Sequence, residues 1–342
     1  MVVPPDLLRA LEADPAERVR NAALRTHATH LPAHQPPHVA QRAAPHHAHA
    51  KHRLVYDCES RTTIPGRLAR RENDPDTGDD EVDRAYHAAG LTHDFFATVF
   101  GRDSIDNRGM HLIASVRYDK AWDNARWDGA QIVYGTGDGT FFASFTTCLD
   151  VMAHELVHGV TQADTGLEYL GESGALNESL SDVFGVLVKQ WSLHQTAHDA
   201  DWLFGTGQIL NHPHAALRSL KAPGSAYELP HSRDRQVAHM RDYVTGLSLE
   251  EEVHINSGIP NHAFYCFATS LGGHAWETAG RIWYDAMRSH LHPRCEFALF
   301  ARATLHAAQS HGHHAVEALR TAWHAVGVDT PAPLRQEIAY PG

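Results

Sequence analysis

Apolar positions in the second half of the chain recur at helical spacing. Leu149, Met152, Leu156 and Val160 follow one another at intervals of three and four residues, which places them on one face of a helix. We therefore expect a helix at 150–161. The same periodicity predicts further helices at 174–190, 255–271, 274–289, 295–310 and 313–325.

The stretch before residue 150 contains shorter apolar runs separated by turn residues. This pattern predicts strands at 54–56, 111–118, 131–134 and 140–143, and one helix beginning at Asp80 and ending near Ala89. A β-rich lobe over 53–149 followed by a helical lobe over 150–342 is an α+β arrangement. The helix at 150–161 lies at the junction of the lobes, where clefts commonly form.

Residues 1–52, here called the first segment, form a third part of the chain. A short helix is expected from Asp6 to Ala13, and Asp14-Pro15 offers an N-cap and a first-turn proline for a second helix ending near Thr26. The tract from His27 to His52 is rich in His, Pro and Ala and cannot build a packed core. We expect a solvated linker there, with weak metal binding by its histidines as the alternative.

Composition excludes several classes of function. With 29 Lys+Arg against 41 Asp+Glu, the net charge of −12 argues against a nucleic-acid partner. No apolar run reaches the ~18 residues that a membrane span needs, and acids and prolines interrupt the N-terminus where a signal peptide would be apolar. The four cysteines form no CxxC pair, which disfavours a zinc ribbon. The sequence leaves open whether two of them form a disulfide.

The helix at 150–161 carries the pattern HExxH. His154 and His158 lie one turn apart on one face and can bind one zinc ion, while Glu155 can act as a base on zinc-bound water. A catalytic zinc usually takes three protein ligands, so a third is required. Glu178 and Asp182, also four residues apart, could supply one zinc ligand and one hydrogen-bond partner for a ligand histidine. Two solvated acids are the alternative.

Three motifs in this order resemble signatures of the thermolysin-like zinc endopeptidases. They are His-Glu-Leu-Val-His-Gly-Val-Thr at 154–161, Asn-Glu-Ser-Leu-Ser-Asp at 177–182 and Val-His-Ile-Asn-Ser-Gly-Ile-Pro-Asn at 253–261. The similarity runs from about Arg53 to Gly327. Pro4-Pro5-Asp6-Leu7-Leu8 looks like part of the short propeptide of the protealysin-like branch.

The resemblance implies the zinc chemistry of the site. His154, His158 and Glu178 would bind one catalytic zinc ion. Glu155 would polarise the water and then pass its proton to the leaving amine. Asp182 would orient His154 through a hydrogen bond.

The resemblance also implies how a substrate would be held. Tyr169 and His254 would donate hydrogen bonds to the developing oxyanion. Asn124 and the backbone of Ala125 would hold the substrate main chain, and Arg218 would bind a substrate carbonyl. The positions that match the specificity pocket are all apolar: Phe142, Phe145, Val151 and Leu217. We therefore expect a broad preference for a bulky apolar residue just after the scissile bond, although Val151 taken singly is more simply explained as a core residue.

The chain departs from the family pattern before the third motif. The family usually has Asp-Asn-Gly-Gly there, and this chain has Leu249-Glu-Glu-Glu252. Leu249 thus replaces the acid that would orient His254, and Glu250 could substitute from the next position. This departure raises the alternative of a zinc-binding protein of this fold with weak or no proteolytic activity. A third possibility keeps the chemistry but acts on short peptides or esters.

Fewer acidic residues than usual stand at the family's calcium-binding positions. Asp138, Asp150 and Asp201 remain, but Lys189 stands at a position that is usually acidic. Because calcium needs several oxygen ligands, an ammonium group there argues against a double site. At most one calcium ion is expected.

The sequence thus predicts a zinc-dependent endopeptidase, made as a zymogen that removes roughly its first 50 residues. Its partners would be protein or peptide substrates and its own first segment as an intramolecular inhibitor, and it would be a monomer. The first segment has no Cys, so a thiolate cannot block the zinc. We expect secretion by a route without a recognisable signal peptide, and cytoplasmic retention is the alternative.

Overall fold

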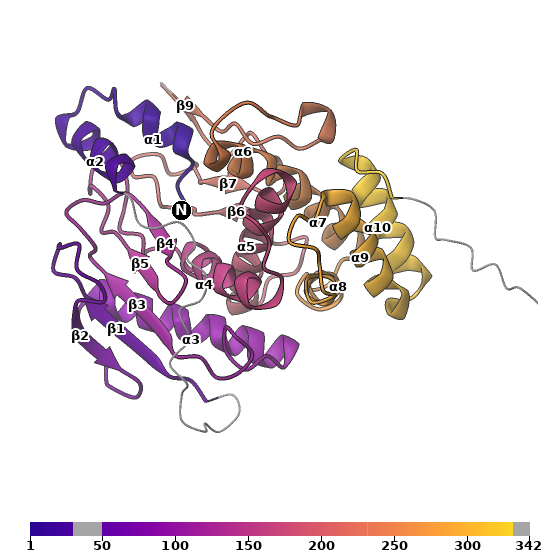
Figure 1. Ribbon diagram of the computed structural model, residues 1–342, viewed down its shortest axis with the longest axis horizontal. Helices are drawn as coiled ribbons and strands as arrows, with labels where there is room; N and C mark the ends of the chain where they lie inside the picture. Colours follow the sequence, from indigo (N-terminus) through magenta and orange to yellow (C-terminus); the bar gives the residue numbers. More distant parts are fainter. Residues whose placement is uncertain (30–49, 231, 331–342) are drawn as a thin grey trace, which may run out of the picture.

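Two long helices, α4 (Leu149–Asp164) and α5 (Gly171–Ser192), lie between a β-sheet and a group of helices (Figure 1). The computed structural model describes residues 1–29, 50–230 and 232–330. Most of the expected linker from His27 to His52 therefore lies outside the described residues. The predicted α+β fold is confirmed, with a β-rich N-terminal lobe and a helical C-terminal lobe.

The sheet of the N-terminal lobe has five strands in the order β2-β1-β3-β5-β4. The bounds are β1 (Arg53–Asp57), β2 (Arg67–Arg71), β3 (Leu112–Val116), β4 (Ala125–Trp127) and β5 (Ile132–Tyr134). The central pairs β1–β3 and β3–β5 are parallel, and both edge pairs are antiparallel. Helix α3 (Asp80–Phe100) packs on this sheet, and α4 contacts the edge strand β4.

The C-terminal lobe consists of five helices and short strand pairs. The helices are α6 (Leu249–Asn256), α7 (Gly258–Leu271), α8 (Thr278–Met287), α9 (Phe297–Ala308) and α10 (His313–Ala325). Strand β6 (Leu203–Phe204) pairs with β7 (Arg218–Ser219), and β8 (Glu228–Leu229) pairs with β9 (Ser232–Arg233). Two 3₁₀ turns, Met240–Asp242 and Gln309–His311, complete the described elements.

Most predicted helices are confirmed, but several local predictions are wrong. Helix α3 continues to Phe100 instead of ending near Ala89. The helix expected at 255–271 is instead two helices that divide at Ser257, and the first of them starts earlier, where the side chain of Ser248 caps it. No strand forms at 140–143, where Phe142 makes only an isolated bridge to Ile209. The Asp138 carboxylate accepts hydrogen bonds from the backbone N–H groups of Thr140 and Phe141 and so closes a turn there.

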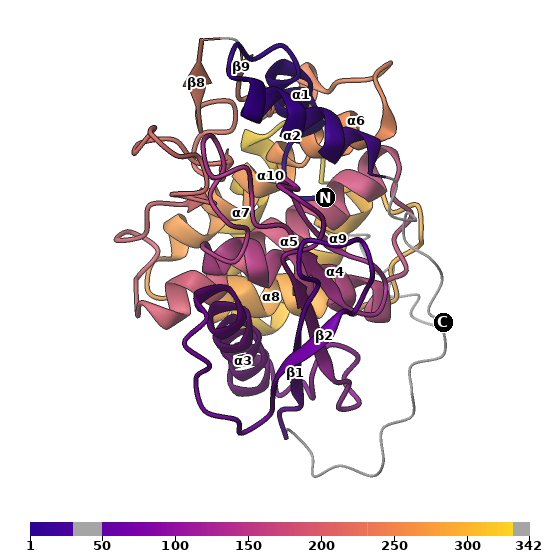
Figure 2. The same ribbon diagram turned by 90° about the vertical axis from the view of Figure 1, so that its left-hand side faces the viewer.

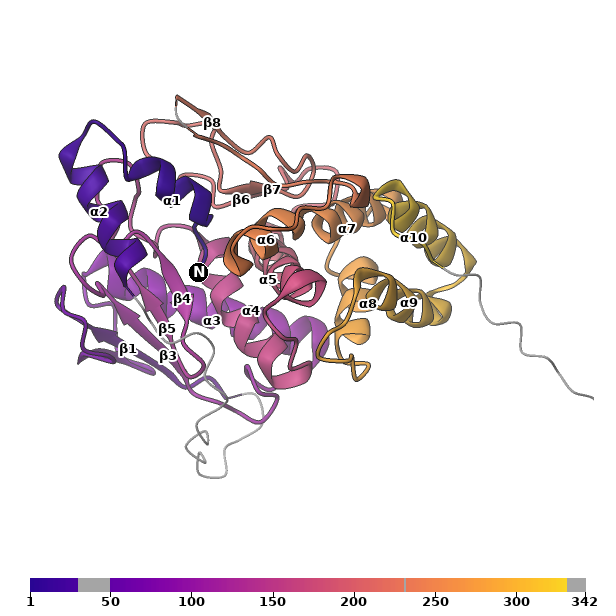
Figure 3. The ribbon, with the colours of Figure 1, turned by 45° about the horizontal axis from the view of Figure 1, so that its top comes forward.

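The first segment lies against both lobes. Its helices α1 (Pro5–Leu11) and α2 (Glu17–Ala28) sit side by side at one end of the molecule, with α1 near α6 (Figures 2 and 3). The start of the chain runs inward, next to α4 and α5 (Figure 3). Asp14 does not cap α2, because its side chain accepts from the N–H of Ala16, and the helix begins at Glu17.

Two expectations about the whole chain can also be compared with the structure. The four cysteines are all free, so none of them forms the disulfide that the sequence left open. Within the described ranges, no helix combines the length and the apolar character that crossing a bilayer requires.

Candidate active site

The two central helices bring three predicted zinc ligands together. His154 and His158 come from α4 and Glu178 comes from α5, and all three are buried. The Nε2 atoms of the two histidines are 3.0 Å apart, and they lie 3.5 and 3.6 Å from oxygens of Glu178. Tetrahedral zinc with bonds of about 2.0–2.1 Å separates its ligand atoms by about 3.3 Å. Among the described residues, no other three His, Cys, Asp or Glu side chains are grouped closely enough to hold a metal ion.

Hydrogen bonds on the far side of each ring orient the two imidazoles. The Nδ1 atom of His154 lies 2.9 Å from a carboxylate oxygen of Asp182, and Nδ1 of His158 lies 2.9 Å from the amide oxygen of Asn177. Because these acceptors take the Nδ1 protons, both Nε2 atoms present lone pairs to each other. Two facing lone pairs require a cation between them, so the donor set fits zinc.

The carboxylate of Glu178 is held in its charged form. Burial raises its pKa, but the neighbouring imidazole rings outweigh burial and hold the pKa well below its usual value. Its Oε2 has no hydrogen-bond partner among the described residues, although it is fully buried. The hydroxyl of Tyr169 donates to Oε1. Oε2 of Glu178 is therefore a charged oxygen without a hydrogen-bond partner among the described residues, and it can serve as the third ligand that zinc requires.

Glu155, next to His154 in α4, forms a hydrogen bond with the edge of the sheet. Its Oε2 accepts a hydrogen bond of 2.6 Å from the backbone N–H of Trp127 in β4. Its Oε1 has no hydrogen-bond partner within the described part of the chain. One oxygen of a buried carboxylate is thus fixed while the other remains available to accept a proton.

Asp182 connects the zinc ligands to the substrate-binding positions. Besides His154, it accepts hydrogen bonds of 2.7–3.0 Å from the guanidinium of Arg218 and one of 2.9 Å from the side chain of Asn261. Burial raises the pKa of Asp182, and Arg218 outweighs burial and lowers it. Sequence reasoning did not find that Arg218 and Asn261 hold Asp182, because neither lies near it in the chain.

The imidazole of His254 is oriented by a backbone carbonyl. Its Nδ1 lies 2.6 Å from the carbonyl oxygen of Glu250, one turn earlier in α6. Leu249 takes no such role, since its side chain is 58% exposed. The expected substitution by Glu250 therefore occurs through its backbone and not through its carboxylate. On the opposite side of the ring, Nε2 faces the carbonyl oxygen of Met1 at 2.6 Å.

The first three residues of the chain form hydrogen bonds with the predicted substrate-binding residues. The N–H groups of Val2 and Val3 donate to the side-chain oxygen of Asn124 at 2.9 and 3.2 Å, and Val2 also donates to the carbonyl of Ala125 at 3.3 Å. The guanidinium of Arg218 donates to the carbonyl of Val2 at 2.7 Å. The backbone of residues 1–3 thus contacts the very groups that the resemblance assigns to a substrate.

The side chains of Val2 and Val3 are buried in the hydrophobic core. Val2 and the four predicted pocket residues are fully buried in one hydrophobic cluster; the four are Phe142, Phe145, Val151 and Leu217. The cluster also contains Phe204, which sequence reasoning missed. Its ring lies 5.2 Å from that of His154 and 4.3 Å from the guanidinium carbon of Arg218. Phe204 precedes Gly205 in a two-residue strand that is too short to give a periodic signal.

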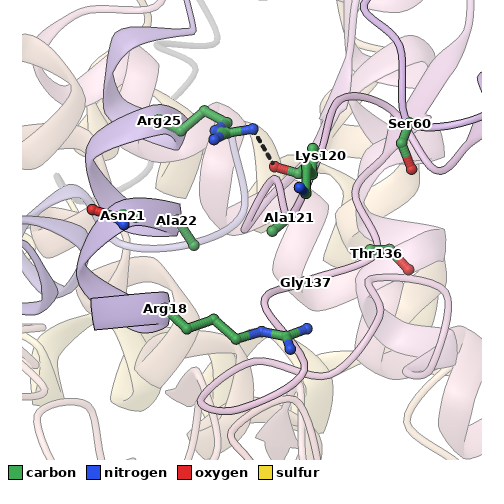
Figure 4. A pocket seen from close by; sticks show the side chains of 9 residues that line it. All are labelled: Arg18, Asn21, Ala22, Arg25, Ser60, Lys120, Ala121, Thr136 and Gly137. Atoms are coloured by element: carbon green, nitrogen blue, oxygen red, sulfur yellow. Dashed lines mark hydrogen bonds between the residues drawn. The ribbon is translucent and has the colours of Figure 1, made fainter. Parts of the chain in front are cut away.

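The second helix of the first segment covers the loops beside Asn124. In Figure 4, Arg18 and Arg25 reach from α2 across a cavity of about 430 Å³, and Arg25 donates to the carbonyl of Lys120 at 3.2 Å. Asp123 and Asp138 are fully buried nearby. Burial and the facing carboxyl group of Asp138 raise the pKa of Asp123 to about 8.

The three acids expected to bind calcium do not come together. Asp138 is engaged by the turn amides and Asp123, whereas Asp150 and Asp201 both contact the ammonium of Lys189, at 2.9 and 3.4 Å. Lys189 also donates to the carbonyl of Leu203. The three-acid site is therefore a wrong expectation, because a lysine supplies the positive charge that two of these acids require.

A buried His₂Glu cluster with a neighbouring free carboxylate oxygen, on helices between a β-rich and a helical lobe, is typical of a zinc metallopeptidase. Two family models together match residues 42–328 with a short gap: "Thermolysin metallopeptidase, catalytic domain" over residues 42–162 and "Thermolysin metallopeptidase, alpha-helical domain" over residues 165–328. The chain belongs to the thermolysin family of zinc metalloendopeptidases.

Individual relatives agree with this assignment. An extracellular metalloprotease of Pectobacterium carotovorum subsp. carotovorum is 44% identical over 346 residues, covering 98% of this chain and 97% of the relative. Protease PrtS of Photorhabdus sp. (strain Az29) is 44% identical over 283 residues, covering 81% of this chain and 76% of the relative. The solved precursor of protealysin from Serratia proteamaculans superposes with a TM-score of 0.88 at 44% identity, covering 96% of this chain and 99% of that structure.

Proposed function

We propose that this zinc endopeptidase is made as a precursor whose first segment blocks the cleft in the manner of a substrate. The observation that carries the proposal is the hydrogen bonding of residues 1–3 to Asn124, Arg218 and His254. In this arrangement the Met1 carbonyl lies where a scissile carbonyl would, and Val2 takes the place of the residue after the bond. A substrate mimic explains inhibition by a segment that contains no Cys.

The residues of this chain divide the chemistry between them. His154, His158 and Glu178 would hold the zinc, which when bound polarises the carbonyl and acidifies a water molecule. Glu155 accepts the proton of that water through its free Oε1 and delivers it to the leaving amine.

Two hydrogen-bond donors would stabilise the oxyanion. Both ring nitrogens of His254 face carbonyl oxygens, and in this proposal Nε2 donates the hydrogen bond to the oxyanion. Tyr169 donates to Glu178 in the precursor, so in this proposal its hydroxyl turns towards the oxyanion when a substrate replaces the first segment.

Substrate preference follows from the surroundings of Val2. Its side chain is fully buried in the hydrophobic core, which also contains the four predicted pocket residues and Phe204. We expect cleavage before bulky apolar residues with little discrimination among them, because one methylene in such a pocket changes binding by only about 1–3 kcal/mol.

The proposal includes export from the cell. The Pectobacterium carotovorum relative is named an extracellular metalloprotease. An endopeptidase that is blocked by its own first segment can pass through the cell that makes it, and removal of roughly 50 residues outside the cell would then release the activity.

Digestion of an unfolded protein tests the function. The processed enzyme is incubated with casein, and the new N-termini are identified by mass spectrometry, alongside short-peptide and ester substrates. We expect apolar residues at the new N-termini and complete loss of cleavage with 1,10-phenanthroline, with recovery on adding zinc. Stoichiometric zinc without cleavage of any substrate would instead support the binding-protein alternative.

A further inference from the structure

The orientation of His254 depends on the first turn of α6. Its Nδ1 atom bonds the carbonyl oxygen of Glu250, and this carbonyl belongs to the first turn of a helix of only eight residues. The ring can therefore be held in place only if that turn keeps its helical geometry. A short helix supplies little stability of its own, so its end must be fixed by other groups.

A capping box fixes this turn. The hydroxyl of Ser248 accepts from the N–H of Glu251, and Oε2 of Glu251 accepts from the N–H of Ser248 at 3.3 Å and from its hydroxyl at 2.7 Å. Buried side chains such as Val253 and Ile255 hold the later part of α6, whereas Leu247 and Leu249 beside its first turn are exposed. The Glu251 carboxylate thus helps to close the turn that carries the Glu250 carbonyl.

The other oxygen of the same carboxylate binds the first segment. Oε1 of Glu251 pairs with the guanidinium of Arg9 in α1, and Arg235 lies 3.6 Å away. Figure 3 shows α1 beside α6. Burial raises the pKa of Glu251, but its hydrogen bonds to Ser248 and Arg9 outweigh burial and lower the pKa. The carboxylate remains charged and serves two partners on its two oxygens.

We infer that Glu251 is a positioning residue for His254 and, through its second oxygen, the anchor for Arg9 of the first segment. The inference rests on the proposed function, in which His254 stabilises the oxyanion and the first segment blocks the cleft. The inference explains how the Leu249–Glu252 stretch replaces the family's acid. The helix backbone orients His254 in place of an acidic side chain, and Glu251, which caps that helix, also binds the first segment.

Glutamine separates the two roles of Glu251. A glutamine can still close a capping box, but it cannot form an ion pair with Arg9. Glu251→Ala removes both interactions. Arg9→Ala, made in a peptide of residues 1–28, removes only the anchor. Glu252→Gln is the matched control, because Glu252 lies in the same turn and contacts only the N–H of Leu247 with its side chain.

The first measurement compares processed enzymes on a short peptide substrate. Relative to wild type, Glu251→Ala should lower kcat about tenfold, the effect of losing a cap, while KM changes less than about twofold. Glu251→Gln should keep kcat within about threefold, because its cap persists. The peptide of residues 1–28 should inhibit both variants at roughly tenfold higher concentration, as should the Arg9→Ala peptide against wild type. Glu252→Gln should match wild type in all three quantities.

The second measurement uses the full chain carrying Glu155→Ala, so it does not depend on activity. Amide hydrogen exchange at 249–256 should accelerate in Glu251→Ala and stay unchanged in Glu251→Gln. Equal kcat for Glu251→Ala and wild type, or equal losses for Ala and Gln, would overturn the positioning role. Unchanged inhibition by the Arg9→Ala peptide would overturn the anchor. If wild type itself cleaves nothing, the proposed function fails, and the exchange rates still show whether Glu251 holds the turn.

Discussion

Replacing Lys189 tests whether its ammonium group takes the place of a bound calcium ion. Its Nζ lies 2.9 Å from Asp150, which is almost fully buried, and 3.4 Å from Asp201, which is largely exposed. Burial lowers the pKa of Lys189, but the two carboxylates outweigh burial and raise it, so the group is charged. Lys189→Gln keeps much of the side-chain volume and removes the charge.

The magnitude follows from the difference between the two acids. Removing one partner of a buried pair leaves an uncompensated charge and costs about 3–5 kcal/mol, whereas an exposed pair contributes about 0–1 kcal/mol. Because Asp150 keeps a hydrogen bond from the N–H of Gly205, we expect the lower end, about 3 kcal/mol in the free energy of unfolding. At about 2.1 cal/mol/K per residue, the unfolding entropy of 342 residues is about 0.7 kcal/mol/K, so this loss corresponds to a fall in Tm of roughly 4 °C.

The assay is thermal unfolding of the Glu155→Ala chain in saturating zinc, with and without millimolar calcium. Wild-type Lys189 should give a Tm that does not respond to calcium. Lys189→Glu should unfold early without calcium and regain stability with it, because three carboxylates then face one another. Lys221→Gln, at an exposed lysine, is the control. A fall of less than about 2 °C in Lys189→Gln, or a saturable rise of the wild-type Tm with calcium, would refute the reasoning.

Two further predictions concern the groups that hold the first segment. Asp123, with a folded-state pKa of about 8 against an ordinary 3.8, contributes stability that is complete below pH 3.8 and is lost as pH rises to about 8. The free energy of unfolding of the Glu155→Ala chain, relative to its Asp123→Asn derivative, should therefore fall by up to about 1.4 kcal/mol per pH unit over that window and then level off. Denaturant titrations at each pH measure this difference. A difference that does not change with pH would contradict the prediction. Arg218→Lys cannot bond both Asp182 and a substrate carbonyl, so kcat/KM on a short peptide should fall roughly 10- to 100-fold, and an unchanged value would exclude the carbonyl contact.

The sequence predicted the zinc ligands because each pair lies on one helix. His154 with His158, and Glu178 with Asp182, are four residues apart, so helical periodicity alone puts each pair on one face. Helices with long apolar stripes, such as α4, α5 and α10, were predicted for the same reason. The start of α6, in contrast, depends on the capping side chain of Ser248, which apolar periodicity does not detect.

Contacts between distant parts of the chain could not be predicted in this way. The pairing of Arg9 with Glu251 and of Lys189 with Asp150 depends on how helices and loops pack, and nothing in their spacing indicates it. The strand expected at 140–143 failed because the short-range hydrogen bonds of Asp138 outweighed an apolar run. The departure at Leu249 was visible in the sequence, but only the structure shows that the carbonyl of Glu250 replaces the missing acid.

The most direct test of this account is the intact mass of the full chain after incubation with zinc, compared with that of Glu155→Ala. If the first segment lies in the cleft of an endopeptidase that uses Glu155 as its base, the wild-type chain should lose roughly 50 N-terminal residues while the variant keeps its full mass. If the variant loses the same residues at the same rate, Glu155 is not the base and the account is contradicted.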